Sequence, residues 1–411
     1  MHACSEEGLE FLGQPIEIVE PFEDLPKVAI NVQLGDASME EIESEIESSD
    51  CFLALTENHK VQKNQALQPL PVTDPRAADQ KHLTFLNYPL SRALQTQINQ
   101  EVVVAVVDTG IDYDHVDLKA RMWKDANGSY GYNYVSKNTD PLDDDNHGTH
   151  VAGIVGAIEN NAFMGAGLTG DYVRLMAVKV LNSDGAGFST DVYNGILYAI
   201  AKGADVINLS VESPEKNPMM EDAIFQATQS GVVVVGATGN QSSEITTRRP
   251  FAPAYLGPEL GGMISVASVD TDSGSLSTFS NYSRVYAEIA APGAETSIGG
   301  SGTTGGILST VPNDQWARNK GTSQATPMVS AAAAMVIGFL KTKGISYTPD
   351  GIEQFIVNNG TVANNTLSPY ISQGRVLNLG WLAQNLYNYV ESSANPTFTG
   401  NESVQSNCFN L

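Results

Sequence analysis

Residues 101–112 read EVVVAVVDTGID, and this stretch decides how the rest of the chain is interpreted. From Val102 it is a continuous apolar run rich in β-branched side chains, which is typical of a parallel strand buried on both faces. Asp108, the first polar residue of the run, would then lie at the carboxyl end of that strand. In open α/β sheets, ligands bind at this edge.

Similar apolar runs recur along the chain, with helical patterns between them. Further strands are predicted at 174–180, 204–209, 232–236 and 263–269, and helices near 148–158, 190–202, 218–230 and 323–340. This alternation predicts a doubly wound α/β fold with a mostly parallel sheet, helices on both faces and right-handed crossovers. We expect this domain to cover residues 83–389.

The composition indicates a soluble globular protein of 411 residues, 42% hydrophobic, with a mean hydropathy of -0.14. We expect no membrane span, because we find no apolar run near the roughly 20 residues that one needs. The net charge of -25 argues against nucleic acid as a partner, since phosphate backbones are bound by Lys and Arg. Residues 1–63 hold 15 Asp and Glu but only 3 Lys and Arg, which predicts a separate N-terminal unit.

That unit, residues 1–64, is predicted to be a small α+β domain. Its expected strands are 15–20, 27–34 and 51–56, and a helix is expected after the capping box that starts at Ser38. Residues 65–82 contain three prolines, which oppose regular structure and indicate a linker. Residues 390–411 are polar and lack periodicity, and we expect a loose C-terminal extension.

The three cysteines, Cys4, Cys51 and Cys408, are too few and too scattered for a disulfide framework. The start MHACSEEG has neither the basic nor the apolar region of a signal peptide. However, Ala-Cys-Ser before acidic residues is typical of a mature bacterial lipoprotein, which would be anchored to a membrane through Cys4. An ordinary exposed cysteine is the alternative.

Three distant segments supply the parts of an activated serine nucleophile. Asp108 ends the run quoted above, His147 lies in DDDNHGTHVAG, and Ser323 lies in NKGTSQATP. In such a set the hydroxyl attacks, the imidazole takes its proton, and the carboxylate orients the imidazole. His147 and Ser323 each begin a predicted helix, and Asn240 follows a predicted strand, so all four side chains can converge on one sheet edge. Taken singly, Asp108 and Ser323 are equally compatible with helix or strand caps, and His147 with a structural role.

These motifs resemble those of the subtilisin-like serine endopeptidases, the subtilase family. DTGID, HGTHVAG and GTSxATP match its Asp, His and Ser blocks in order, and the resemblance covers about residues 83–388. It implies peptide-bond hydrolysis through an acyl-enzyme, with Ser323 as nucleophile, His147 as general base and then acid, and Asp108 as orienting carboxylate. GATGN matches the oxyanion block, which implies that Asn240 and the backbone N–H of Ser323 bind the oxyanion.

The resemblance also gives residues 1–64 a role as an inhibitory propeptide. IESSDCFLALTENHKVQ resembles the end of such a propeptide, which implies self-cleavage near Asn64 and intramolecular inhibition before it. An unrelated accessory domain is the alternative. We expect protein or peptide substrates and a secreted or cell-envelope location in a bacterium. A narrow-specificity processing protease and a catalytically silent protein-binding module remain open as alternative functions.

The chain departs from the family pattern at several positions. Gln324 follows the nucleophile where the family usually has Met, which oxidises to the sulfoxide, so we predict peroxide-resistant activity. The family's Ser-x-Gly-Gly in the substrate cleft is replaced by Ser210-Val211-Glu212-Ser213. We expect Ser210, Glu212 and Gly239 to bind substrate. Lys320 also departs from the family's usual Asn, with no effect that we can derive.

Acidic residues also precede His147, at Asp143, Asp144 and Asp145. Together with Glu212 they would give the cleft negative charge and favour basic substrate side chains. A solvated acidic surface and a cation site are the alternatives.

Calcium is the cofactor that the resemblance implies. Asp117 matches the first position of the family's calcium site, and the loop at Asn160 and Asn161 matches the second in a shortened form. Oxygen-rich loops suit a hard cation. A solvated loop without a bound cation is the alternative.

Overall fold

The computed structural model describes residues 66–295, 305–363, 366–393 and 396–399, together with two short antiparallel strands, β1 (Glu10–Phe11) and β2 (Gln14–Pro15). The chain divides into a small unit, Met1–Lys63 with Ser392–Ala394, and a large unit that holds the remainder. Except for Pro15, the elements predicted before residue 65, the three cysteines and the cleavage position near Asn64 lie outside the described residues.

The large unit is built on a nine-stranded sheet with the order β12-β13-β9-β8-β7-β6-β3-β5-β4, parallel throughout except for the β12–β13 pair. The strands are β3 (Val102–Asp108), β4 (Gly131–Asn133), β5 (Val173–Lys179), β6 (Val206–Leu209), β7 (Val233–Ala237), β8 (Met263–Asp270), β9 (Ile289–Ala294), β12 (Thr361–Val362) and β13 (Arg375–Val376). The five predicted strands are confirmed to within two residues at each end.

The chain reverses its direction of travel across the sheet at β3. The next strand that pairs with β3 along the chain, β5, lies on one side of it and β6 lies on the other. At such a switch point the loops beyond the two strand ends diverge and leave a crevice. The fold therefore places a binding crevice just beyond Asp108, the last residue of β3.

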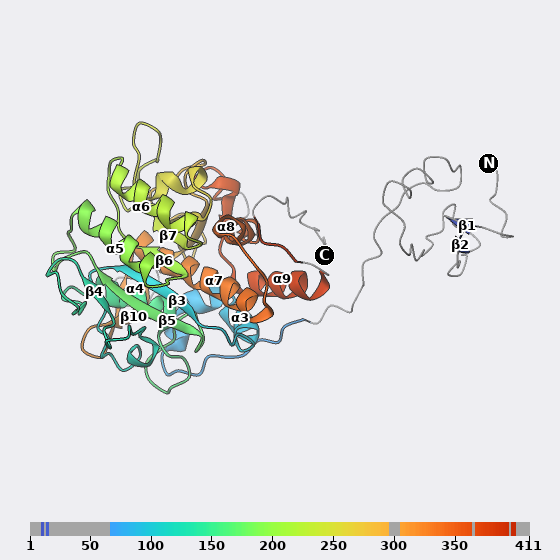
Figure 1. The fold of residues 1–411 in the computed structure, drawn as a ribbon, viewed down its shortest axis with the longest axis horizontal. Coiled ribbons are helices and arrows are strands. Elements are labelled where there is room, and N and C mark those ends of the chain that lie inside the picture. The colour runs from blue at the N-terminus through green and yellow to red at the C-terminus, as the bar shows by residue number, and fades with distance from the viewer. Residues whose placement is uncertain are drawn as a thin grey trace. The chain divides into compact units, whose positions relative to one another are not determined.

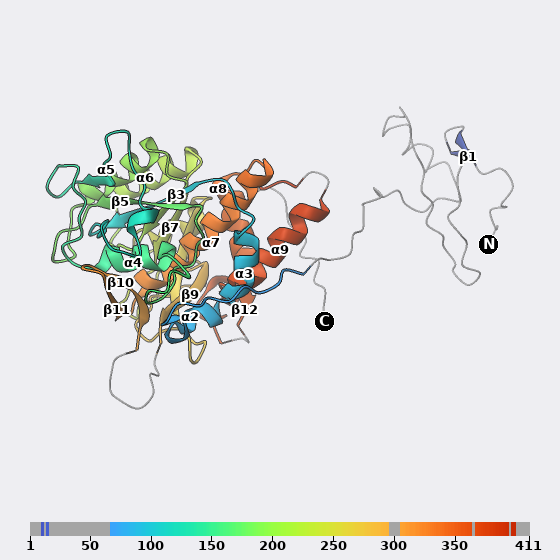
Figure 2. The same cartoon turned by 90° about the horizontal axis from the view of Figure 1, so that it is seen from below.

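Helices cover both faces of the sheet (Figures 1 and 2). They are α2 (Lys81–Phe85), α3 (Tyr88–Gln95), α4 (His147–Gly156), α5 (Ser189–Ala201), α6 (Pro218–Gln229), α7 (Thr322–Lys343), α8 (Pro349–Asn358) and α9 (Leu379–Ser392). Successive side chains of a strand point to opposite faces. Val104 and Val106 accordingly pack in one core with α4 and α7, and Val103 and Val107 in a second core with α5 and α6. This confirms the doubly wound α/β fold.

A hairpin of β10 (Ile307–Val311) and β11 (Gln315–Asn319) leads into α7 and packs beside α4. The side chains of Ser309 and Thr310 donate hydrogen bonds of 2.8 Å to the backbone carbonyls of His150 and Thr149 in α4. The hairpin thus ties the helix that begins at His147 to the helix that contains Ser323.

Two expectations about the fold were wrong. By length and composition α7 is apolar enough to cross a membrane, contrary to our expectation that no such run exists, but its most apolar stretch is almost wholly buried, as befits a core helix. The tail is also less loose than expected, because α9 continues to Ser392 and Phe398 is buried against Phe355 and Tyr389. Besides the ring of Phe398, its backbone carbonyl attaches this segment to the body, because it accepts the N–H of Thr348 at 2.8 Å. Residues 400–411 lie outside the described residues.

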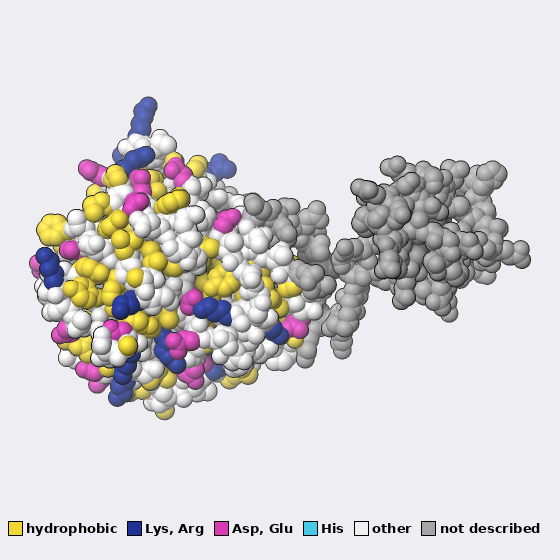
Figure 3. Space-filling view, viewed as in Figure 1, with side chains coloured by type: hydrophobic (Ala, Val, Ile, Leu, Met, Phe, Trp, Pro, Cys, Tyr) yellow, Lys and Arg dark blue, Asp and Glu magenta, His cyan; other side chains and the backbone are white. Residues whose placement is uncertain are grey.

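On the face seen in Figure 3, acidic, basic and apolar side chains are interspersed over the described part of the chain. The large exposed apolar side chains include Phe188, Phe225, Val285 and Trp381. Phe188 is the most exposed of them and lies at the crevice described next.

Candidate active site

Asp108 lies at the end of β3 with its carboxylate fully buried. Its Oδ1 accepts the backbone N–H of Thr109 at 2.7 Å and lies 2.7 Å from Nδ1 of His147. Its Oδ2 has no hydrogen-bond partner among the described residues. An ionised Asp108 fixes the proton of His147 on Nδ1, which leaves Nε2 free to accept another proton.

His147 is the first residue of α4, and glycine lets this helix approach the end of β3 closely. A Cβ atom on Gly148 would lie 2.1 Å from the carbonyl oxygen of Gly110 and 3.2 Å from Cβ of Asp108. Any larger residue at Gly148 would push α4 away from β3 and separate His147 from Asp108. The glycine of the HGTH pattern is therefore required by the close packing of α4 against the end of β3.

The acidic run before His147 does not act as one surface. Asp143 is buried and accepts hydrogen bonds from Thr109 Oγ1 at 2.8 Å and from the N–H of Thr149 at 2.9 Å. Asp144 pairs with the buried Nζ of Lys179 at 2.5 Å. Only Asp145 lines the crevice, so the expectation that all three aspartates charge the cleft was wrong for Asp143 and Asp144.

Lys179 holds three segments together at the end of β5. Its Nζ donates to the backbone carbonyls of Thr109 at 2.6 Å and Leu181 at 2.8 Å, in addition to Asp144. A buried ammonium group is stable only when its donors are satisfied. Here those donors fix the turn after Asp108 against the loop that leads to His147.

Opposing effects set the pKa of His147. Burial lowers this pKa. The charge of Asp108 and the hydrogen bond to Asp108 raise the pKa, and the charges of Asp145 and Asp143 raise it further. The net shift of the pKa is upward from 6.5. The imidazolium form is therefore stabilised, which suits a group that must hold a proton during a reaction.

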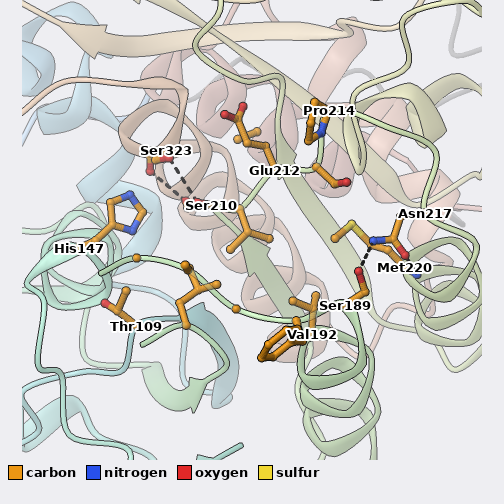
Figure 4. Close-up of a pocket in the computed structure, with 18 of the residues that line it drawn as sticks. Thr109, His147, Ser189, Val192, Ser210, Glu212, Pro214, Asn217, Met220 and Ser323 are labelled. Carbon is orange, nitrogen blue, oxygen red and sulfur yellow. Dashed lines mark hydrogen bonds between the residues drawn. The ribbon is translucent and has the colours of Figure 1, made fainter. Parts of the chain in front are cut away.

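Ser323 is the second residue of α7, and it does not cap the helix. The N-cap position is Gly321, so the alternative interpretation of Ser323 as an N-cap was wrong. Its Oγ donates to the backbone carbonyl of Ser210 at 3.3 Å, and Ser210 Oγ donates to the carbonyl of Ser323 at 2.9 Å (Figure 4). Ser210 thus holds the serine in two places, as part of a buried chain that continues to Asn208 and Ser330.

Asn240 is held so that its amide nitrogen is left for the crevice. Its Oδ1 accepts the backbone N–H of Thr322 at 2.9 Å and the hydroxyl of Thr322 at 3.2 Å. The preceding Gly239 has a φ of +101°, which favours glycine, and its N–H donates to Thr322 Oγ1 at 3.1 Å. Gly239 is buried and is not among the residues that line the crevice, so it supports the loop rather than forming the binding surface.

The crevice has a volume of about 460 Å³ and holds the predicted groups together. His147, Ser323, Asn240, Ser210 and Glu212 all line it, and Figure 4 shows His147 and Ser323 beside one another. Sequence reasoning missed Phe188, which lines the crevice with 76% of its surface exposed. The available signal was GAGF at 185–188, because a glycine-rich loop offers little to bury an aromatic ring.

The two other departures from the family pattern have different surroundings. Gln324 is buried, with 2% of its surface exposed, directly after Ser323. Lys320 is exposed and makes no hydrogen bond or ion pair with any described residue. Nothing in the structure explains the lysine.

The side chains of Asp117 and Asn160, the predicted calcium ligands, have different hydrogen-bond partners. Asp117 is fully buried and accepts Nδ2 of Asn161 at 2.6 Å and Nε1 of Trp316 at 3.0 Å. Asn160 instead directs its Oδ1 to the N–H of Thr73 at 2.7 Å. The side chain that faces Asp117 is therefore that of Asn161. Within the described ranges, no group of three or more His, Cys, Asp and Glu could hold a metal ion.

The comparisons with known proteins identify the family of this chain. The subtilase family matches residues 99–375. The chain is 38% identical to a thermophilic serine proteinase of Bacillus sp. (strain AK1), over 57% of this chain and about half (51%) of that protein. It is 35% identical to thermitase of Thermoactinomyces vulgaris, over 66% of this chain and 85% of that protein.

Two solved structures are similar in fold. A cold-adapted subtilisin-like serine proteinase aligns with a TM-score of 0.55 and 25% identity, over 68% of this chain and 88% of that one. A protease from Pseudoalteromonas arctica aligns with a TM-score of 0.63 and 27% identity, over 77% of this chain and 99% of that one. With the fold, the crevice and these matches taken together, the chain belongs to the subtilase family and is a serine endopeptidase.

Proposed function

We propose that the chain hydrolyses peptide bonds of protein substrates through an acyl-enzyme formed on Ser323. The observation that carries this is the 2.7 Å contact between the buried Asp108 and Nδ1 of His147, which lines the same crevice as Ser323. His147 takes the proton of the Ser323 hydroxyl as the hydroxyl attacks the carbonyl carbon, and then gives that proton to the leaving amine. Water repeats the sequence to release the acyl group.

Before it can attack, the Ser323 hydroxyl must leave its resting partner. It donates to the carbonyl of Ser210 at 3.3 Å, a long hydrogen bond that costs little to exchange for one to His147. The tetrahedral intermediate then carries a negative oxygen. The side-chain amide of Asn240 and the N–H of Ser323 are the donors proposed for it, and losing such a donor typically costs about 10²–10³ in turnover.

We also propose that residues 1–64 are an inhibitory propeptide that the enzyme removes from itself. Support comes from the acidic bias of this segment and from the division of the chain into units after Lys63. Three residues after the proposed cleavage position, the chain is hydrogen-bonded to the catalytic domain, because the N–H of Leu67 donates to Oε1 of Gln384 at 2.8 Å. A secreted or envelope-bound enzyme, anchored if Cys4 is lipidated, is the proposed context.

The experiment that tests this proposal follows the purified chain over time by mass spectrometry. Wild type should lose a fragment that ends near Asn64, and Ser323→Ala should stay intact under the same conditions. Equal cleavage of both proteins would identify a contaminating protease as the cause. An intact wild type that also fails to cleave casein would contradict the proposed function.

A preference for basic substrate side chains is a second proposal, favoured by the charges in the crevice. Asp145 and Glu212 both line it, and within the described parts of the chain no Lys or Arg does so. Oε1 of Glu212 accepts a hydrogen bond from the side-chain amide of Gln241, while Oε2 lies over Gly239. A substrate cation would therefore meet one oxygen that is not already engaged by Gln241. This is the processing-protease alternative in structural terms.

A calcium site at Asp117 is a third proposal, with its ligand set revised. Asp74 and Asp117 are both buried and face the same loop: Asp74 accepts the N–H groups of Asn160 and Asn161, and Asp117 accepts the side chain of Asn161. Burial raises the pKa of Asp117, and the nearby charge of Asp74 raises it further, although hydrogen bonds oppose this. Two buried carboxylates offer the oxygen ligands that Ca²⁺ takes, and Asn161 would join them by turning its Oδ1 toward the ion in place of the Nδ2 that donates to Asp117. Asp74, Asp117 and Asn161 are the side chains that would hold it.

A further inference from the structure

Asn281 is a buried residue that lies outside the crevice but contacts the loop that carries Asn240. It follows β8 in the chain, and none of its surface is exposed. Neither the sequence motifs nor the proposed mechanism uses it. A buried amide needs partners for two donors and two acceptors, so its hydrogen bonds show what it supports.

All four hydrogen bonds of the Asn281 side chain are made to the loop at residues 238–243. Nδ2 donates to the carbonyl of Thr238 at 2.9 Å and to Oε1 of Gln241 at 2.7 Å. Oδ1 accepts the backbone N–H groups of Gln241 and Ser243, each at 3.0 Å. These partners lie on both sides of Asn240 in the chain, so the amide of Asn281 links the two ends of the loop.

The backbone of Asn281 strengthens the same connection. Its N–H donates to the carbonyl of Gly239 at 2.8 Å, and its carbonyl accepts the hydroxyl of Thr238 at 3.1 Å. A Cβ atom on Gly239 would lie 2.5 Å from Nδ2 of Asn281, so the two segments pack without space between them.

The loop needs such support because its own conformation is unfavourable. Gly239 and Ser242 both have positive φ angles, +101° and +53°, and the side chains of Asn240, Gln241 and Ser242 are exposed. A serine in this region is strained and persists only when its surroundings impose it. Thr322 holds the amide oxygen of Asn240 from one side, and Asn281 holds the flanking backbone from the other.

We propose that Asn281 is a positioning residue for the oxyanion-binding amide of Asn240. It touches no substrate atom itself; it sets where Nδ2 of Asn240 lies relative to Ser323. The inference rests on the proposed role of Asn240. Stabilisation of a developing oxyanion depends on donor position, and a misplacement of about 1 Å can cost about 10²-fold in rate.

The test is a double-mutant cycle between Asn281→Ala and Asn240→Ala, measured as kcat and KM on a chromogenic peptide amide. We expect Asn281→Ala to lower kcat by about 10- to 100-fold with KM changed by less than about 3-fold, because only the transition state loses a contact. In the Asn240→Ala background the same change should cost less than about 3-fold, because the amide that it positions is gone.

A matched control separates this effect from the loss of any buried amide. Gln95→Ala removes an amide that is 5% exposed and bonds to Ser91, Leu168 and the hydroxyl of Tyr172, near the start of β3 rather than its end. It should lower the thermal midpoint without changing kcat. Asn281→Ser, which keeps one hydroxyl for the loop, is made in parallel in case Asn281→Ala does not fold, and its kcat should fall less.

The outcomes are distinguishable. If Asn281→Ala lowers kcat equally in wild type and in Asn240→Ala, the effect is a general structural one and the inference is overturned. The same conclusion follows if Gln95→Ala lowers kcat as much as Asn281→Ala does. Unchanged kcat in Asn240→Ala would overturn the role of Asn240 and the inference with it, while leaving the nucleophile intact. A wild type without turnover would overturn the proposed function itself.

Discussion

Nδ1 of His147 lies 2.7 Å from Oδ1 of Asp108, a carboxylate with no exposed surface at the end of β3. This contact joins the first residue of a helix to the last residue of a strand 39 positions earlier in the chain. Gly148 makes this contact possible because it lets the helix approach the strand. Lys179 and Asp143 both hydrogen-bond to Thr109 and so fix the turn that follows Asp108.

The raised pKa of His147 predicts the acid limb of the pH–rate profile. His147 accepts a proton only when neutral, so kcat/KM should rise with pH through a pKa above 6.5. Asp145→Asn removes one of the charges that raise this pKa while keeping an oxygen for the N–H of His147, and should move the limb to lower pH. The profile is measured with a neutral peptide substrate. A limb that stays in place, or moves to higher pH, would contradict this account of the pKa.

The buried pair Glu288 and Glu353 predicts that stability depends on pH. Burial raises the pKa of both groups, and the neighbouring charge of Glu288 raises that of Glu353 further. A raised folded-state pKa gives stability that is full below the unfolded value of about 4.3 and is lost as pH rises through the folded value. Glu353→Gln, which can still accept the N–H of Gly262, should therefore raise the thermal midpoint at neutral pH and flatten its pH dependence.

Calorimetry on enzyme blocked by a sulfonyl fluoride checks this without self-digestion. Glu391→Gln, which removes an exposed carboxylate in the ion pair with Lys343, is the control and should leave the pH dependence unchanged. If the thermal midpoints of wild type and Glu353→Gln change with pH in parallel, the buried pair is not the cause of the pH dependence.

Gln324 predicts that activity survives peroxide. The position beside the nucleophile holds an amide that peroxide does not oxidise, and it is buried. Wild type should retain most of its activity under mild peroxide, and Gln324→Met should lose it quickly. Met220 is the methionine among the crevice-lining residues, but only 3% of its surface is exposed. Rapid loss of wild-type activity, with oxidation mapped to Met220, would show that Gln324 is not sufficient.

Calcium should stabilise the enzyme through Asp117. A ligand at 100 times its Kd adds about 2.7 kcal/mol to the stability of the folded state, so a chelator should lower the thermal midpoint by several degrees. Asp117→Asn and Asn161→Ala should abolish the response to added Ca²⁺. Asn160→Ala, whose side chain bonds to Thr73 instead, should keep it. Identical midpoints for wild type with and without chelator would dismiss the site.

The carboxylates in the crevice predict selectivity between substrates. A peptide library should show enrichment of Lys or Arg at one or more positions, and the enrichment should fall with added salt because charge steers it. Glu212→Gln and Asp145→Asn should each reduce it, while Asp184→Asn, outside the crevice, should not. A library profile without basic enrichment would leave general proteolysis as the function.

Much of this site could be predicted from the sequence because its parts sit at the ends of regular elements. Asp108 ends an apolar strand, and His147 and Ser323 lie in the first turns of apolar helices, so local patterns locate them. The carboxyl edge of a parallel sheet then brings them together. The division of the acidic run was not predictable, because it depends on Lys179, which reaches Asp144 from a strand 35 positions away.

The other omissions have the same cause. Asn281 acts through hydrogen bonds to residues about 40 positions earlier, and a single Asn in a serine-rich loop gives no local signal of this. Asn160 and Asn161 are chemically identical neighbours, and only the backbone conformation decides which one faces Asp117. Sequence patterns specify elements; contacts between loops depend on how those elements pack.

The central claim is that Ser323 is an activated nucleophile, and covalent labelling of the processed enzyme tests it most directly. A fluorophosphonate probe should form one adduct, located on Ser323 by peptide mass spectrometry, at a rate that rises as His147 loses its proton. Ser323→Ala should not label, and His147→Ala should label far more slowly. An adduct on another serine, or no adduct on properly folded enzyme, would contradict the account and leave a protein-binding module with a subtilase fold.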